Sequence, residues 1–387
     1  MYQAFGVVDM IWRSFRDGLL QVHLWLALIL CVPMIVIGIS GSALLLQREI
    51  LAGSIPSVGT PGQSQPIPNI IAAAQRAAPA NMRPNRFELP ARNGAASVVR
   101  LSPSTEGGAS VDIYVDPVSL KILGTSEVVE RGPVLAFLIT IHAFLAMPPP
   151  IGLPFVGWTG VIMTLMGISG VVLWWPGKGQ WRRAFLLRRG TRGIPFYFDL
   201  HRVAGIWGLL VFLAVSVSGI YLTFPQKIGP FVKAHLSGED TVTKPQLGYV
   251  AGSGPICPEQ AIALARSAVP NARVASLELP GADKTFVVEL EPQGLAPTEP
   301  HVVVVLDADT ADLSYIDDPR NYSFPDQLLN WQHLLHFGVG LGLLWKVLVF
   351  LSGLLPLLLA ITGLTVWWKK RQVKKAKDIA EVSAIAE

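Results

Sequence analysis

Four long apolar stretches limit the folds open to this chain of 387 residues. They run from about residues 22 to 46, 156 to 175, 204 to 224 and 343 to 368. A helix needs roughly 20 apolar residues to cross the hydrocarbon layer of a membrane, and each stretch meets that length. The sequence therefore predicts an α-helical membrane protein with four transmembrane helices.

The lysines and arginines beside these stretches indicate how the helices are oriented. Positive charges gather in the connection between the second and third stretches and in the C-terminal tail, and Arg13 and Arg16 precede the first stretch. Cytoplasmic segments of membrane proteins carry an excess of such residues. We therefore expect both termini and the basic connection in the cytoplasm, and the two long intervening segments on the exported side. No small-x-small cleavage site follows the first stretch, which favours an uncleaved anchor over a signal peptide.

One series of motifs occurs twice along the chain. Each copy has a histidine near the start of an apolar stretch, a Ser-Gly pair further along it, a second histidine after the exported segment, and a hydroxyl residue with glycine ahead of a Trp-Trp pair. The first copy comprises His23, Ser40-Gly41, His142, Ser169-Gly170 and Trp174-Trp175, and the second comprises His201, Ser218-Gly219, His336, Thr362-Gly363 and Trp367-Trp368. Gly41 and Gly219 each follow their histidine by eighteen positions, which on an ideal helix returns to the same face about 27 Å away. This repetition predicts two equivalent halves.

Each long exported segment predicts a small α+β unit, with an amphipathic helix followed by alternating strands. The helices are expected at residues 70–80 and 258–270, and the clearest strands at 97–101, 111–115, 285–290 and 301–306. Neither segment has a dense cluster of His, Cys or carboxylates that would indicate a metal-hydrolase site. The glycine-rich run at residues 338–342 follows no strand, so it predicts a bend into the fourth apolar stretch rather than a dinucleotide site.

The order of these motifs resembles the PepSY-associated transmembrane family. The features that carry the resemblance are a helix and hairpin ending in Ile113-Tyr114-Val115-Asp116-Pro117, set between membrane helices with Leu-His entries and Ser-Gly-x-x-Leu-Trp-Trp exits. The resemblance covers nearly the whole chain, and within the family it is most similar to FoxB-type ferric-siderophore reductases. It implies four transmembrane helices in two repeated halves, each with an exported small α+β, PepSY-like domain, in a bacterial cell inner membrane.

The resemblance divides the chain into eight parts. These are the N-terminus and first transmembrane helix at 1–50, a first periplasmic PepSY-like domain at 51–132, an interfacial helix and second transmembrane helix at 133–176, a basic cytoplasmic loop at 177–198, a third transmembrane helix at 199–225, a second periplasmic PepSY-like domain at 226–326, an interfacial helix and fourth transmembrane helix at 327–369, and a basic cytoplasmic tail at 370–387.

The repeated histidines are candidate ligands of haem iron, which imidazoles from facing helices commonly hold. A single histidine at a membrane border more often bonds lipid headgroups or caps a helix, but four at matched positions favour a cofactor. Together with the resemblance, they predict two haem b groups, with His23 and His201 on the cytoplasmic side and His142 and His336 on the outer side. His333, three residues before His336, is a second ligand, a partner or an alternative to it.

Two further features near the third apolar stretch bear on such a cofactor. Any of Arg182, Arg183 and Arg202, which precede the stretch, is a candidate partner of haem propionates at the inner face. Small residues beside His201, among them Gly205 and Gly208, are expected to leave room for a flat group.

The resemblance implies a dihaem b-type oxidoreductase that passes electrons to a periplasmic ferric siderophore and so releases iron. No catalytic side chain is identified. The cytoplasmic segments are too short for a nucleotide or flavin domain, which takes on the order of 100 residues, so electrons are expected from a separate cytoplasmic reductase or from quinol. No feature points to nucleic acid.

Two other classes of function are open. One is a non-enzymatic membrane sensor or anchor whose PepSY-like domains bind another protein through exposed strand edges. The other is a transporter, since internal repeats also mark alternating-access folds. The four apolar stretches contain no Asp or Glu, which disfavours the transporter.

Overall fold

The computed structural model describes residues 2–47, 56, 58, 61–90, 94–103, 110–127, 132–236, 254–292 and 301–386. The chain forms two compact units. One is helical and combines Met1–Leu45, Phe137–Gly229 and Gln332–Glu387, and the other combines Leu46–Ala136 with Pro230–Trp331. The predicted border between the first helix and the first exported domain, at residues 50 and 51, lies outside the described residues.

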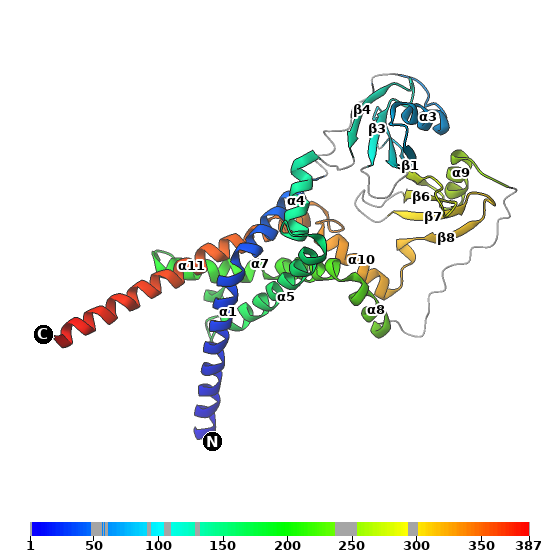
Figure 1. The fold of residues 1–387 in the computed structure, drawn as a ribbon. Coiled ribbons are helices and arrows are strands. Elements are labelled where there is room, and N and C mark those ends of the chain that lie inside the picture. The colour runs from blue at the N-terminus through cyan, green and yellow to red at the C-terminus, as the bar shows by residue number, and fades with distance from the viewer. Residues whose placement is uncertain are drawn as a thin grey trace. The chain divides into compact units, whose positions relative to one another are not determined.

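Four long helices dominate the helical unit, namely α1 (Tyr2–Leu44), α5 (Pro149–Trp174), α7 (Ile194–Thr223) and α11 (Gly342–Ala386) (Figure 1). Each contains a segment long and apolar enough to cross a membrane, and these segments are Met10–Leu44, Pro149–Trp174, Ile194–Thr223 and Gly342–Ile379. The prediction of four such helices is confirmed. α1 and α11 continue well past the apolar stretches into polar sequence, because arginine and lysine are good helix formers.

The long helices pack as a four-helix bundle. α1 and α7 each pack against both α5 and α11, so α1 and α7 stand at opposite corners. Glycines bring the backbones close where α1 crosses α11, since a side chain on Gly38 or Gly353 would collide with the other residue's backbone. Ser42 of α1 also donates a hydrogen bond to the Phe350 carbonyl of α11, at 2.8 Å.

Shorter helices precede or follow the long ones along the chain. They are α4 (Gly132–Phe144), α6 (Trp181–Ala184), α8 (Pro225–Leu236) and α10 (Phe324–His336). One of them, α6, connects α5 to α7. The predicted bend after α10 is confirmed, because Gly338, Gly340 and Gly342 all have positive φ angles, between 67° and 85°, which glycine adopts without steric cost. The corresponding turn after α4 leads into Pro148-Pro149-Pro150, and proline suits the first turn of α5 because its fixed φ is already helical.

The second unit is built on one eight-stranded antiparallel sheet, with strand order β4-β3-β2-β1-β5-β6-β7-β8. The strands are β1 (Met82–Glu88), β2 (Ser97–Pro103), β3 (Val111–Val115), β4 (Ile122–Glu127), β5 (Ala272–Glu278), β6 (Thr285–Pro292), β7 (Val302–Asp307) and β8 (Leu313–Asp317). The two predicted α+β units are therefore not separate, because β1 pairs with β5 and joins them. The four strands expected from alternation are present as β2, β3, β6 and β7.

Helices α3 (Ile67–Ala77) and α9 (Pro258–Ala268) cover one face of this sheet (Figure 1). α3 begins three residues earlier than the sequence predicts, directly after Pro66. Each helix closes an apolar cluster with its own four strands, centred on Phe87 and Leu101 in one half and on Leu277 and Val288 in the other. Alternation along the strands sends the remaining side chains to the opposite face.

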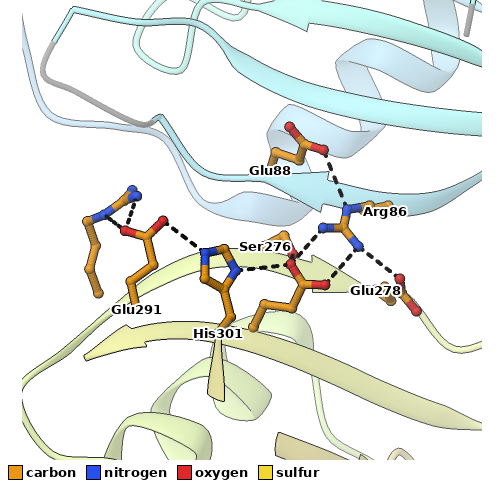
Figure 2. A network of polar contacts seen from close by, with 8 residues as sticks. Arg86, Glu88, Ser276, Glu278, Glu291 and His301 are labelled. Atoms are coloured by element: carbon orange, nitrogen blue, oxygen red, sulfur yellow. Dashed lines mark hydrogen bonds and ion pairs between the residues drawn. The ribbon is translucent and has the colours of Figure 1, made fainter. Parts of the chain in front are cut away.

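Arg86 of β1 lies where the two halves of the sheet meet, on the face opposite the helices (Figure 2). Its guanidinium bonds to Glu278 of β5 at 2.9 Å and to Glu289 of β6 at 2.7 Å, and Glu88 lies 3.5 Å away. Because Glu278 and Glu289 come from the second half, one side chain of the first half ties the two halves together.

His301 extends this network, with its ring nitrogens 3.5 Å from Glu289 and 3.2 Å from Glu291 (Figure 2). Ser276 donates to Glu289 at 2.8 Å. The bond with His301, followed by the bonds from Arg86 and Ser276, outweighs burial and lowers the pKa of Glu289 to about 2. We call this set of side chains the junction network; it comprises Arg86, Glu88, Arg273, Ser276, Glu278, Glu289, Glu291 and His301.

Candidate functional site

The four histidines of the repeated motifs lie in the helical unit, and the structure brings two of them, His142 and His336, together. His23 is on α1 and His201 is on α7, the two helices at opposite corners of the bundle. His142 lies near the end of α4, and His336 is the last residue of α10. All four side chains are half-buried.

His142 and His336 face one another. Their ring centres are 6.1 Å apart and their planes are inclined at 51°. A metal ion between two opposed imidazoles, with metal–nitrogen bonds of about 2 Å, separates the ring centres by about 6 Å. The separation of the two ring centres is therefore one at which both imidazoles could hold the same metal ion.

Each ring of this outer pair is held through its Nδ1 atom by a carbonyl and a hydroxyl of one long helix. His142 Nδ1 lies 2.9 Å from the Ile37 carbonyl and 3.3 Å from Ser40 Oγ, both on α1, and His336 Nδ1 lies 3.1 Å from the Val215 carbonyl and 3.2 Å from Ser218 Oγ, both on α7. The two rings thus have matching supports on opposite corners of the bundle.

The inner pair is supported in a similar manner by the other two long helices. His201 Nδ1 lies 3.1 Å from the Leu359 carbonyl and 3.0 Å from Thr362 Oγ1, both on α11. His23 Nδ1 lies 2.8 Å from Ser169 Oγ on α5.

These contacts determine which ring nitrogen carries the proton. A carbonyl can only accept a hydrogen bond, and each of the four hydroxyls already donates to a carbonyl of its own helix. The donor bonds are Ser40 to Val36 at 2.6 Å, Ser169 to Met166 at 2.9 Å, Ser218 to Val215 at 3.0 Å and Thr362 to Leu358 at 2.8 Å. The Nδ1 atoms of His142, His201 and His336, which each face a carbonyl, are therefore donors, and their Nε2 atoms have an available lone pair. For His23 the bond from Ser169 to Met166 favours the same tautomer, because the serine oxygen is then left to accept. No described residue bonds to any of these Nε2 atoms.

A glycine lies beside each histidine ring, directly after the hydroxyl residue in the sequence. A Cβ placed on Gly41 would lie 2.7 Å from Cε1 of His142, and one on Gly219 would lie 3.1 Å from Cε1 of His336. On the inner side, a Cβ on Gly363 would lie 3.4 Å from His201, and one on Gly170 would lie 4.0 Å from His23. We call each hydroxyl–glycine pair a histidine seat. The glycines leave room for the imidazoles, most closely at Gly41, where any side chain would collide with the ring.

The structure separates His333 from the outer pair. Its side chain is exposed and meets the Tyr221 ring edge-on, with ring centres 5.8 Å apart, and it stacks on Phe337 at 6.5 Å. The ring that faces His142 is that of His336. His333 is therefore a neighbour of the outer pair on the same helix.

Arg202 binds the connection that precedes α7. Its Nη2 donates to the carbonyls of Arg183 and Leu186, both at 3.2 Å, and lies 3.5 Å from the Asp199 carboxylate. Its Nε atom is buried and has no partner among the described residues. Arg202 is thus largely occupied by protein contacts, with one buried donor still available to another group.

The sequence did not predict a role for Asp199 or for the seat hydroxyls. Asp199 is buried on α7 and accepts two hydrogen bonds from Arg188, at 2.6 and 3.1 Å. The seat hydroxyls were visible as repeated motifs, but their histidine partners lie more than 100 residues away. The expectation that Gly208 leaves room for a flat group is wrong, because a Cβ there would lie 2.6 Å from Leu355 of α11.

The donor set suits a macrocyclic metal cofactor better than a bare metal ion. Among the described residues, no three His, Cys, Asp or Glu side chains come close enough to hold an ion by themselves. Each pair instead supplies two imidazoles with fixed tautomers. Haem brings four ring nitrogens of its own and takes imidazoles as axial ligands. The residues present therefore fit haem.

The chain was compared with known proteins. The search of curated proteins found no match. The sequence model of the PepSY-associated TM region matches residues 20–370, which include all of α5 and α7, the larger part of α1 and α11, the four histidines and the eight-stranded sheet. The chain therefore belongs to the family of proteins with a PepSY-associated TM region.

Proposed function

We propose that this protein is a dihaem b-type oxidoreductase of the bacterial inner membrane that passes electrons to a periplasmic ferric siderophore. The observation that carries the proposal is the opposed pair His142 and His336, with ring centres 6.1 Å apart and both Nε2 lone pairs available. The family membership and the apolar bundle support it. The two repeated halves then each contribute one ligand to each centre.

The chain's own residues have three tasks in this proposal. The imidazoles of His23, His201, His142 and His336 bind iron through Nε2. The seat hydroxyls and carbonyls keep Nδ1 protonated, so that the ligands do not change tautomer when the charge of the iron changes. The bound haem supplies one-electron transfer. Two centres are needed because the hydrocarbon layer is about 30 Å thick and one centre cannot serve both faces.

The direction of electron flow rests on the distribution of charge along the sequence. The basic segments beside α5, α7 and α11 support a cytoplasmic location for both termini and a periplasmic one for the sheet with α3 and α9. Electrons enter from a separate cytoplasmic reductase or from quinol and leave at the outer pair. A ferric chelate that accepts one electron becomes ferrous, and the lower charge weakens its hold on oxygen ligands, which releases the metal.

The first test is the visible spectrum of the purified protein, oxidised and dithionite-reduced, with a pyridine haemochrome assay. We expect b-type α-bands and two haems per chain. One haem per chain would overturn the two-centre arrangement. A colourless protein that takes up no haem when it is supplied would overturn the redox function and favour a non-enzymatic sensor or anchor.

A second test addresses the acceptor. The reduced protein is mixed anaerobically with a ferric siderophore, and haem reoxidation is followed together with capture of ferrous iron by a chromogenic chelator. We expect one ferrous ion for each electron lost from haem. Reoxidation by simple ferric chelates but by no siderophore would overturn the proposed substrate and leave the haem assignment standing.

A further inference from the structure

The four histidine seats differ in one respect. For His142, His201 and His336, Nδ1 has both a backbone carbonyl and a hydroxyl within 3.3 Å. For His23, Nδ1 has one partner among the described residues, Ser169 Oγ at 2.8 Å. The orientation of His23 therefore depends on a single hydrogen bond.

The equivalent seat in the other half shows what His23 lacks. There the Leu359 carbonyl, three residues before Thr362, accepts from both the Thr362 hydroxyl at 3.1 Å and His201 Nδ1 at 3.1 Å. At the His23 seat the carbonyl three residues before Ser169 belongs to Met166, and it accepts from the Ser169 hydroxyl at 2.9 Å. The serine thus stands between His23 and the carbonyl.

Contact with the neighbouring glycine is also weakest at this seat. A Cβ on Gly170 would be 4.0 Å from the His23 ring, whereas the corresponding distances at the other seats are 2.7 to 3.4 Å. Among the described residues this ring thus has one hydrogen-bond partner, and the glycine beside it leaves more room than at the other seats. The Ser169 hydroxyl is therefore the main contact by which α5 restrains the His23 ring.

We infer that Ser169 is the positioning residue for His23, and that its hydroxyl alone holds the ring with Nε2 directed for iron binding. This inference rests on the proposed haem function. Without the hydroxyl, Nδ1–H has no acceptor in place, so the ring turns about its side-chain bonds and exchanges tautomers. Loss of such a supporting partner typically lowers metal affinity about 10–100-fold.

The test compares three variants of the full-length protein: Ser169→Ala, Ser169→Thr and Thr362→Ala. Haem affinity, haem per chain and the low-spin electron paramagnetic resonance signals are measured for each. We expect Ser169→Ala to lose inner-centre affinity by about 10–100-fold and to change one low-spin signal. Thr362→Ala should lose only a few-fold, because the Leu359 carbonyl still holds His201. Ser169→Thr should keep the haem affinity of the wild type, because threonine supplies the corresponding hydroxyl, that of Thr362, in the other half.

The outcomes separate the inference from the proposed function. If the wild-type protein contains no haem, the proposed function is wrong. If the wild type contains two haems but Ser169→Ala and Thr362→Ala lose haem affinity equally, only the inference about Ser169 is overturned. Ser169→Ala is also made in a His23→Ala background. If the serine acts through His23, it adds no further loss there. An additional loss of haem would show that it acts on the fold, and would also overturn the inference.

Discussion

In the helical bundle, each of the four half-buried imidazoles bonds to the protein through one nitrogen and leaves the other without a partner among the described residues. In the β-sheet unit, by contrast, the side chains of the junction network bond to one another. Arg86 reaches three carboxylates, and His301 lies between Glu289 and Glu291.

This difference indicates separate roles for the two sets of polar groups. A neutral imidazole nitrogen with a lone pair can bind a metal ion, so a structure that leaves this nitrogen without a protein partner at four matched positions suits a ligand. A network that satisfies its own members is arranged to hold strands together. Changes in the bundle should therefore alter cofactor content, and changes in the junction network should alter stability.

The largest expected effect is from alanine at the outer pair. His142→Ala and His336→Ala should each remove the same haem, because both rings face one site, and the double variant should lose no more than either single variant. Haemochrome content and reduced-minus-oxidised spectra measure this. His333→Ala is the matched control and should keep both haems. Loss of different haems from the two single variants would break the pairing.

The next effect concerns the seat glycines. Gly41→Ala places a methyl group 2.7 Å from His142, which forces the ring to move and costs about 1–3 kcal/mol of binding or folding free energy. Gly170→Ala places a methyl at an ordinary 4.0 Å from His23 and should be tolerated. Haem content measured side by side would show the difference. Equal haem loss in both would indicate a general intolerance of α1 and α5 to larger side chains.

Arg86→Ala should destabilise the sheet and leave haem content unchanged. The change strands Glu289 and Glu278 without their cation, at a cost of about 1–3 kcal/mol. Hydrogen exchange of the β1 and β5 amides in the full-length protein should become faster. Arg100→Ala, which breaks the pair with Asp112 inside one half, should cost about 1 kcal/mol or less and leave the β1–β5 pairing protected. A loss of haem in Arg86→Ala would contradict the separation of roles.

The smallest effect is a pH dependence of the sheet. The pKa of Glu289 lies at about 2 in the folded protein, below its ordinary value of 4.5. Its contribution to stability is therefore complete above about pH 4.5 and is lost as the pH falls toward 2. Protection of β5 and β6, corrected for intrinsic exchange rates, should decline over that range. Glu289→Gln should be less stable at neutral pH and show a flatter decline.

Much of the bundle and part of the sheet could be predicted from the sequence. Length and hydropathy identify the four long helices, and alternation identifies β2, β3, β6 and β7. The repeated motifs also point to the histidines, two of which the structure brings together. These patterns are local, because the residues that line one face of a helix or strand recur at a fixed spacing in the sequence and share the same apolar or polar surroundings.

Strand β1 shows why the rest could not be predicted. Its sequence, Met-Arg-Pro-Asn-Arg-Phe-Glu, contains proline and asparagine, which are depleted in strands. It is nevertheless the centre of the sheet, because β2 pairs on one side and β5, almost 200 residues away, pairs on the other. The joining of the two predicted units into one sheet depends on this pairing.

Four apolar helices, two matched sets of histidines and four hydroxyl–glycine pairs can be read directly from the amino-acid sequence. The pairing of each hydroxyl–glycine pair with its histidine, the contact of His333 with Tyr221 and the single hydrogen bond between Ser169 and His23 become visible only in the folded chain. Periodicity and residue type act over a few positions of the chain. Hydrogen-bond partners are chosen by packing between helices that are 100 or more residues apart, and no local pattern encodes that choice.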